Sequence, residues 1–157
     1  MNTLSEAKLK QLLNLPQAPL TTFFEDGKWM VLDVLRKKKI VLTPEEWVRQ
    51  HLVHYLIGYK NYSKSLFVLE KGLKYNQLFK RLDVLVMDRT GNPFLLIECK
   101  APEIDLSQRT IEQVCLYNHT VKARYIAISN GLKHVCMSYS GKENGFIPMP
   151  DFPDFDS

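Results

Sequence analysis

The strongest constraint on the fold is the segment Lys80–Pro102, in which a cluster of turn-forming residues separates two apolar runs. The apolar runs are Leu82–Met87 and Phe94–Ile97, and the cluster between them is Asp88–Asn92. Apolar and β-branched runs on either side of such a cluster are typical of a β-hairpin. The segment therefore predicts two antiparallel strands near the middle of the chain.

The register of this hairpin brings charged side chains together. If the turn is centred between Thr90 and Gly91, residues whose numbers add up to 181 face each other, and Asp83 lies opposite Glu98. Lys100 follows Glu98 by two positions, so both side chains leave the same face of the strand. Two carboxylates and one ammonium group are therefore expected at one place beside the sheet.

Such a cluster suits a bound cation. Adjacent carboxylates raise each other's pKa unless a cation lies between them. A hard divalent ion with oxygen ligands fits the gap, and we expect Mg²⁺, with Mn²⁺ as a substitute. The ammonium group of Lys100 could then face an anionic oxygen of a substrate. The alternative is a solvated ion-pair cluster on a surface hairpin, without a function.

Length and composition indicate one globular domain. A chain of 157 residues, 45% of them hydrophobic and 24% charged, suits a single core. We expect the domain to span residues 1–142, with its core at about 43–140 and an acidic, proline-containing tail at 143–157. Residues 141–157 are expected to be extended and at most partly ordered.

Other features of the chain favour the cytoplasm. No apolar run approaches the roughly 20 residues that cross a bilayer, and the N-terminus lacks the apolar stretch of a signal peptide. The three cysteines show no C-x-x-C spacing and are expected to be reduced thiols. We therefore expect a cytoplasmic protein without a membrane partner.

The charge distribution is uneven. The last fifteen residues contain four acids and no Lys or Arg, so the net charge of +4 for the whole chain becomes +8 for residues 1–142. A moderately basic body fits an anionic partner such as nucleic acid. A soluble protein with a few additional lysines explains the charge equally well.

The N-terminal region predicts a short helix and a hairpin. Leucines at approximately helical spacing predict a helix over 4–13, before Pro16. Asp26-Gly27 between apolar residues predicts a hairpin whose second strand is Trp29–Leu35. The basic run Arg36–Lys39 could contact phosphates, although such a run is more often a solvated turn.

A second helix has several agreeing start signals. Thr43 is a good N-cap, Pro44 occupies the first helical position, and Glu46 completes a capping box. The helix is expected to run to about Ile57 and to end at Gly58. Glu45 and Glu46 favour capping and support of the helix dipole, and the alternative is an outer acid near the metal cluster.

Two histidines of this helix, His51 and His54, are three residues apart and could share a face. Zinc binding would need further ligands, so a structural role is favoured.

The region between this helix and the hairpin is less specific. Residues 65–69 predict a strand, and residues 72–79 predict a polar connection. Lys71, Lys74 and Tyr75 interleave charge with an aromatic ring, which suits a nucleic-acid groove or, more often, an ordinary loop.

After the hairpin, Asp105 is expected to cap a helix over 106–121. Gln113 and Tyr117 lie one turn apart on it, so that Gln113 could bind a metal-bound water or a phosphate, or be a polar residue at the rim. Strands are expected at 124–128 and 133–139, separated at Ser129–Gly131.

The resulting order is helix, three strands, helix and strand, with a late strand added, which predicts an α/β (α+β) fold with a mixed central sheet. The chain resembles the PD-(D/E)xK nuclease superfamily and, more narrowly, small relatives of the N-terminal nuclease domain of type I restriction enzyme R subunits. The matching residues are Thr43–His51, Arg81–Asp83, Ile97–Pro102, Gln113 with Tyr117, and Ser129–Gly131. The sequence departs from the superfamily pattern at Leu82, where the signature proline, which supplies no ligand, would stand.

The resemblance implies a restriction-endonuclease-like fold and a Mg²⁺-dependent endonuclease, restriction-related, that acts on DNA. Asp83 and Glu98 would bind the metal, with the Cys99 carbonyl. Lys100 would orient the attacking water, Gln113 would support water or phosphate, and Glu45 or Glu46 would be an outer acid. Contacts to nucleic acid would come from Lys71, Lys74, Arg81 and Tyr117.

Two alternatives stay open at this point. The chain could be a non-catalytic nucleic-acid-binding or interaction module that retains the fold, because 157 residues leave little surface for recognising a target. It could also be a subunit that cleaves only with a larger restriction-type partner. Cleavage of both DNA strands would be easier for a homodimer.

Overall fold

The computed structural model describes residues 5–68, 84–140 and 145–155. Its elements follow each other in the order α1 (Glu6–Leu9), β1 (Thr22–Glu25), β2 (Lys28–Leu32), β3 (Lys39–Val41), α2 (Pro44–Tyr59), the 3₁₀ helix η1 (Lys64–Leu66), β4 (Val84–Met87), β5 (Pro93–Cys99), α4 (Gln108–Val121), β6 (Tyr125–Ser129), β7 (His134–Tyr139) and β8 (Phe146–Met149). None of the described helices is long and apolar enough to cross a membrane.

Strands β4 to β8 form a mixed sheet in the order β4-β5-β6-β7-β8. β5 and β6 run parallel and are connected through α4, whereas the other neighbouring pairs are antiparallel. β5 is consequently hydrogen-bonded along both edges.

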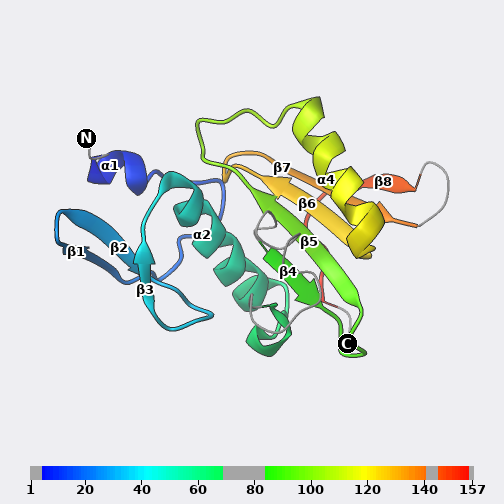
Figure 1. Ribbon diagram of the computed structural model, residues 1–157, viewed down its shortest axis with the longest axis horizontal. Coiled ribbons are helices and arrows are strands. Elements are labelled where there is room, and N and C mark those ends of the chain that lie inside the picture. Colours follow the sequence, from blue (N-terminus) through cyan, green and yellow to red (C-terminus); the bar gives the residue numbers. More distant parts are fainter. Residues whose placement is uncertain (1–4, 69–83, 141–144, 156–157) are drawn as a thin grey trace.

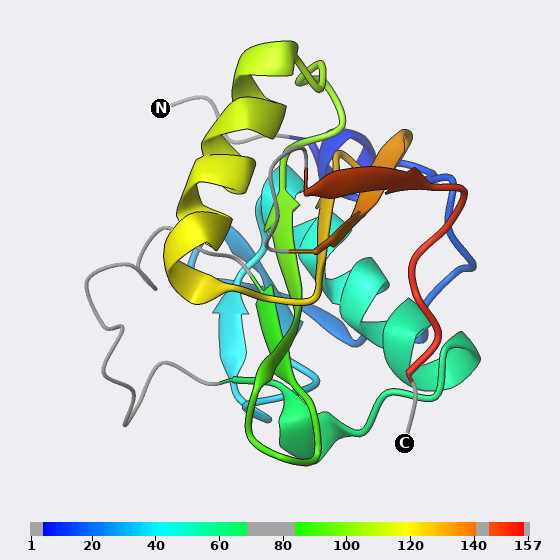
Figure 2. The ribbon, with the colours of Figure 1, turned by 90° about the vertical axis from the view of Figure 1, so that its right-hand side faces the viewer.

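The two faces of this sheet are covered by different helices, as Figure 2 shows with α2 and α4 on opposite sides of β5. Leu85 and Leu96 pack in one cluster with Val114 of α4. Their neighbours along the strands, such as Ile97, pack in another cluster with Leu52 of α2. This period of two follows from the pleat of a strand. A mixed sheet flanked by helices confirms the predicted α/β fold class.

The central hairpin has the predicted register. Val84 faces Ile97, Leu85 faces Leu96 and Val86 faces Leu95, so each pair adds up to 181. A bulge then shifts Met87 opposite Pro93. The predicted pair Asp83 and Glu98 would come next along the ladder, but Asp83 lies outside the described residues.

The predicted N-terminal hairpin is also present. Asp26 and Gly27 have φ values of 50° and 73°, as a tight two-residue turn between β1 and β2 requires. β3 extends this hairpin to a three-stranded sheet, and α2 lies between the two sheets (Figure 1). Val31 of β2 is fully buried in the same cluster as the apolar residues of α2.

Helix α2 begins as predicted. The side chain of Thr43 accepts a hydrogen bond from the Glu46 backbone N–H at 3.0 Å, and Pro44 is the first helical residue. The helix does not end at Gly58 but continues to Tyr59. Gly58 faces open space, and one exposed glycine costs a helix only about 1 kcal/mol.

Several predicted elements are shorter or placed differently. The helix expected over 4–13 is limited to α1, and the second strand of the hairpin ends at Leu32. The strand expected at 65–69 is wrong for Ser65 and Leu66, which lie in the 3₁₀ helix η1, whereas Phe67 forms a β-bridge with Val86 and Leu69 lies outside the described residues. Serine on both sides of Lys64 favours a turn, since serine side chains bond locally.

The helix α4 is capped by Ser107 rather than by Asp105. The Ser107 hydroxyl accepts a hydrogen bond from the Thr110 backbone N–H at 3.2 Å, so the helix begins at Gln108. Asp and Ser are comparable N-caps, and the sequence alone does not choose between them.

The C-terminal segment differs from the extended tail that the sequence predicts. Phe146–Met149 forms β8, which pairs with β7 at the edge of the sheet. Phe152 and Phe155 are buried, with 3% and 7% of their surface exposed. The ring of Phe155 lies 4.9 Å from that of Phe94, and the Tyr62 hydroxyl donates to the Pro153 carbonyl at 2.8 Å. These aromatic contacts outweigh the acids and prolines that suggested a tail.

We expect the Phe155→Ala variant to lower the free energy of unfolding by about 3–5 kcal/mol, because it leaves a cavity in the core. Urea unfolding measures this change. Asp154→Asn alters the neighbouring residue, which is 71% exposed, and should stay within about 0.5 kcal/mol of the wild type. Equal stability of the Phe155 variant and the wild type would contradict a structural role for this segment.

Candidate active site

The site centres on Glu98, near the end of the central strand β5. Glu98 lies beside Ile128 of β6 in the parallel pair, and its side chain is 15% exposed. It follows Leu96 by two positions and so belongs to the α4 face of the sheet. Because β5 is paired on both edges, the position of this carboxylate is fixed by the backbone.

Lys100 lies beside Glu98, as the sequence predicts. Its ammonium nitrogen Nζ is 3.3 Å from Glu98 Oε1, and its side chain is 31% exposed. The backbone N–H of Lys100 donates to the Ser129 carbonyl at 2.8 Å, which extends the β5–β6 ladder by one residue. The ammonium group is thus anchored at the strand end and can still reach solvent.

The second carboxylate oxygen of Glu98 has no such partner. Oε2 is buried, and no hydrogen bond from the described residues reaches it. Burial raises the pKa of Glu98, the charge and hydrogen bond of Lys100 lower it, and the charge of Glu45 raises it again. The net pKa is raised. A buried oxygen to which no described residue donates is costly, which makes Oε2 a candidate ligand atom.

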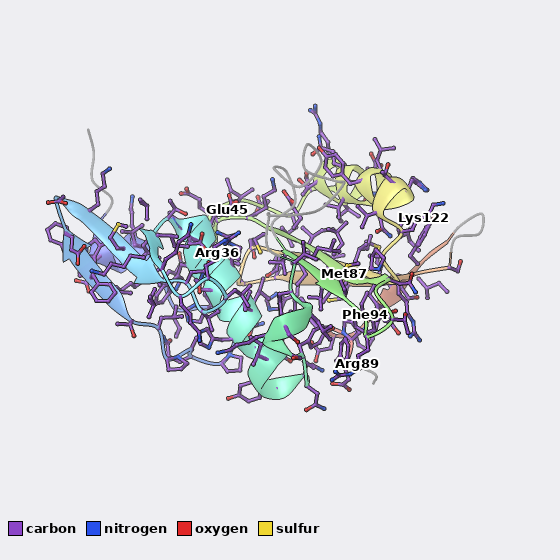
Figure 3. The ribbon with its side chains drawn as sticks, turned by 60° about the horizontal axis from the view of Figure 1, so that its bottom comes forward. Arg36, Glu45, Met87, Arg89, Phe94 and Lys122 are labelled. Carbon is purple, nitrogen blue, oxygen red and sulfur yellow. The ribbon has the colours of Figure 1, made fainter. Side chains whose placement is uncertain are left out.

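Glu45 and Glu46 of α2 have different surroundings. Glu45 is exposed and lies near enough to Glu98 to act on its pKa. Figure 3 shows Glu45 at the start of α2, far from the β4–β5 turn where Met87 and Arg89 lie. Glu46 instead forms an ion pair with Arg49 and accepts a hydrogen bond from Gln50 Nε2 at 3.1 Å. Of the two acids, Glu45 is therefore the one that lies near the site.

The capping box expected at Glu46 is only half present. Thr43 caps the Glu46 backbone, but the Glu46 carboxylate is engaged with Arg49 and Gln50.

For the remaining predicted site residues, a role beside this pair stays a prediction. Gln113 is exposed on α4 and Tyr117 is half-buried, and no hydrogen bond within the described residues joins either to Glu98 or Lys100. The side chain of Cys99 is buried in the cluster that contains α2, and a metal-binding role of its carbonyl stays a prediction. Asp83, Arg81, Lys71 and Lys74 lie outside the described residues.

Asn130 supports the site in a way that the sequence analysis missed. Its Nδ2 donates to the Ile104 carbonyl at 2.8 Å, and its Oδ1 accepts the backbone N–H groups of Leu132 and Lys133 at 3.0 and 2.8 Å. Asn130 therefore fixes both the turn after β6 and the loop that follows Lys100. In the sequence, Asn130 is part of the Ser129–Gly131 turn, which indicated the end of a strand but not the hydrogen bonds of the Asn130 side chain.

The donors present fit a hard cation. Glu98 Oε2 is unpartnered and Glu45 adds a second carboxylate nearby, and oxygen ligands of this kind suit Mg²⁺. Within residues 5–68, 84–140 and 145–155, no group of three or more His, Cys, Asp or Glu residues could hold a metal. The sequence predicts Asp83, which lies outside these residues, as a further ligand.

Comparison with known proteins shows the family to which the chain is similar. The family model described as type I restriction enzyme R protein N terminus matches residues 44–153. The match begins at the first residue of α2 and includes every element of the five-stranded sheet. Searches of curated proteins and of solved structures gave no significant match.

The raised pKa of Glu98 predicts an effect on stability. In the folded state the carboxyl group binds its proton more tightly than in the unfolded state, so stability falls as the pH rises through the folded pKa. In EDTA at pH 8, we expect Glu98→Gln to melt a few degrees above the wild type, since ~1 kcal/mol corresponds to about 2–4 °C in a domain of this size.

Thermal unfolding across a range of pH checks this. The difference in melting temperature between Glu98→Gln and the wild type should shrink as the pH falls towards 4.5, the ordinary pKa of glutamate. A variant that is less stable than the wild type at pH 8 would show that the carboxylate is stabilised in place.

Proposed function

We propose, because the chain belongs to the type I restriction enzyme R protein N-terminal family, that it is a nuclease that hydrolyses phosphodiester bonds in DNA with a bound divalent cation. The observation that carries this proposal is the buried, unpartnered Oε2 of Glu98 beside the ammonium group of Lys100. A module that only binds nucleic acid has no need of such a costly arrangement.

The cation would be held by Glu98 and by Asp83, with Glu45 as an outer acid and the Cys99 carbonyl as a further oxygen donor. Mg²⁺ bound there would supply positive charge that offsets the negative charge developing on the phosphate, and Mn²⁺ would substitute for it. The raised pKa of Glu98 favours a cation as its partner, since a nearby positive charge stabilises the ionised carboxylate.

Lys100 would act on the substrate side of the same site. Hydrolysis joins the oxygen of a water molecule to phosphorus and breaks one ester bond of the backbone. Lys100 is partly exposed and fixed by the ladder to β6, so its ammonium group can orient that water and stabilise the charge on the phosphate. Gln113 would contact water or phosphate from its place on α4.

We expect Lys100→Ala to abolish Mg²⁺-dependent cleavage of plasmid DNA while circular dichroism and melting temperature stay close to those of the wild type. The physical reason is the loss of a charge that acts on the reacting phosphate. A matched control is Lys122→Ala, which removes an exposed lysine at the opposite end of α4 from its first turn (Figure 3) and should cleave normally. Equal cleavage by Lys100→Ala and the wild type would remove Lys100 from the mechanism.

One observation favours a second candidate, in which cleavage needs a larger partner. The matching family is described as the N terminus of an R protein, which implies that its members are parts of larger proteins. The isolated chain would then bind DNA but leave plasmid intact in both Mg²⁺ and Mn²⁺. Nicking by the isolated wild type, lost in Lys100→Ala, would exclude this candidate.

A further inference from the structure

A second concave site lies away from Glu98, where the N-terminal segment, the three-stranded sheet, α2 and η1 meet. It is a groove of about 340 Å³, within the range of ligand pockets. Lys37, His54, Lys64 and Thr21 line it together with apolar residues such as Leu20 and Leu32, and most of its surface is apolar. These residues are distant in the sequence and converge only in the fold.

The groove is positively charged. Lys37 and Lys64 are exposed, and no ion pair within the described part of the chain engages either of them. Asp33 also borders the groove, but its carboxylate is only 3% exposed and is paired with Arg36 at 2.9 Å. The negative charge of Asp33 is therefore offset inside the protein, whereas no ion pair among the described residues offsets the two lysines.

His54 adds a polar group without a charge. Burial lowers the pKa of His54, and the neighbouring His51 and Lys64 lower it further. The imidazole is consequently neutral at pH 7 and can donate one hydrogen bond. The effect of Lys64 on His54 also indicates that the two side chains lie close together.

The position of Lys37 is fixed in advance. Lys37 has a left-handed φ of 56°, and its backbone N–H donates to the Asp33 carbonyl at 2.8 Å. Asp33 N–H donates in turn to the Lys38 carbonyl at 2.9 Å. Gln50 of α2 fastens this turn, because its Nε2 donates to Asp33 Oδ1 at 3.3 Å and its Oε1 accepts the Val34 N–H at 3.3 Å. The backbone that carries Lys37 is therefore held in one conformation by hydrogen bonds before any ligand binds.

The surrounding charge points to a polyanion. Residues 1–43 contain seven Lys or Arg and four Asp or Glu, so they carry +3 of the chain's net charge of +4. These residues precede the segment that matches the family, which begins at residue 44. Residues 1–43 are thus moderately basic, and they include one wall of the groove.

We propose that the groove formed by Lys37, His54 and Lys64 binds phosphate groups of a nucleic-acid backbone and anchors DNA away from the cleavage site. The assignment to DNA rests on the proposed nuclease function. His54 follows Glu45 by nine residues, or roughly 14 Å along α2 at 1.5 Å per residue. This spacing corresponds to about four base pairs of duplex along the helix axis, and the two positions lie half a turn apart around α2.

The test compares two pairs of substitutions in the full chain. Lys37→Gln with Lys64→Gln removes two charges from the groove. Lys122→Gln with Lys133→Gln removes two exposed charges elsewhere, and Lys122 shares the left-handed backbone of Lys37, with a φ of 59°. Binding of a labelled DNA duplex is measured by fluorescence anisotropy in EDTA at several salt concentrations, with ATP and inorganic phosphate as competitors.

The groove pair should weaken duplex binding by about tenfold and reduce the slope of log Kd against log salt by about 2, since each lost phosphate contact reduces it by about 0.9. The control pair should stay within twofold of the wild type. An equal effect of both pairs, or none from the groove pair, would overturn the proposal. So would binding of ATP or inorganic phosphate that depends on the groove lysines while duplex binding does not.

The Lys100→Ala variant separates this inference from the proposed function. If the wild type binds duplex through the groove but does not cleave it, the nuclease proposal is wrong and the proposal that the groove binds DNA is supported. If Lys100→Ala loses cleavage and the Lys37→Gln, Lys64→Gln variant binds duplex like the wild type, the proposal that the groove binds DNA is wrong and the nuclease proposal is supported.

Discussion

The buried position of the Glu98 carboxylate, in which only Oε1 contacts Lys100, depends on the rigidity of β5. The strand is hydrogen-bonded to β4 and β6, and its apolar neighbours Leu96 and Ile97 are fully buried on opposite faces. Glu98 therefore cannot turn to solvent without disturbing the sheet. Lys100 offsets part of the burial cost, but the pKa of Glu98 stays raised. A carboxylate held in this way would be stabilised further by a bound cation, which is the role we propose for Mg²⁺.

Helix α2 connects the proposed cleavage site at Glu98 with the groove that we propose binds the DNA backbone. Its first turn carries Glu45, which acts electrostatically on Glu98, and its third turn carries His54, which borders the basic groove. Gln50 lies between them and binds the turn that presents Lys37. Apolar residues of α2, such as Leu52 and Leu56, are fully buried in the core. A helix fixed in this way keeps the spacing between a cleavage site and an anchoring site constant.

The elements that the sequence predicted correctly are those with strong local signals. The turn cluster and the apolar runs beside it fix the register of β4 and β5, and the Thr43 cap fixes the start of α2. The errors arose where distant contacts decide. Phe67 is held by a single bridge to Val86 instead of a strand, and Phe155 packs on Phe94 although acids and prolines surround it. No local pattern reports a contact between residues that are far apart in the chain.

The sequence by itself determined the alternation of side chains along β5, and with it the placement of Glu98 and Lys100 on one face, because a strand repeats every two residues. Only the tertiary structure decided which of the two α2 acids lies near Glu98, since Glu46 is engaged by Arg49 and Gln50 whereas Glu45 is not. It also decided that Lys37, His54 and Lys64 share a groove. Local geometry follows from covalent periodicity, whereas convergence of distant charges depends on how the helices and sheets pack.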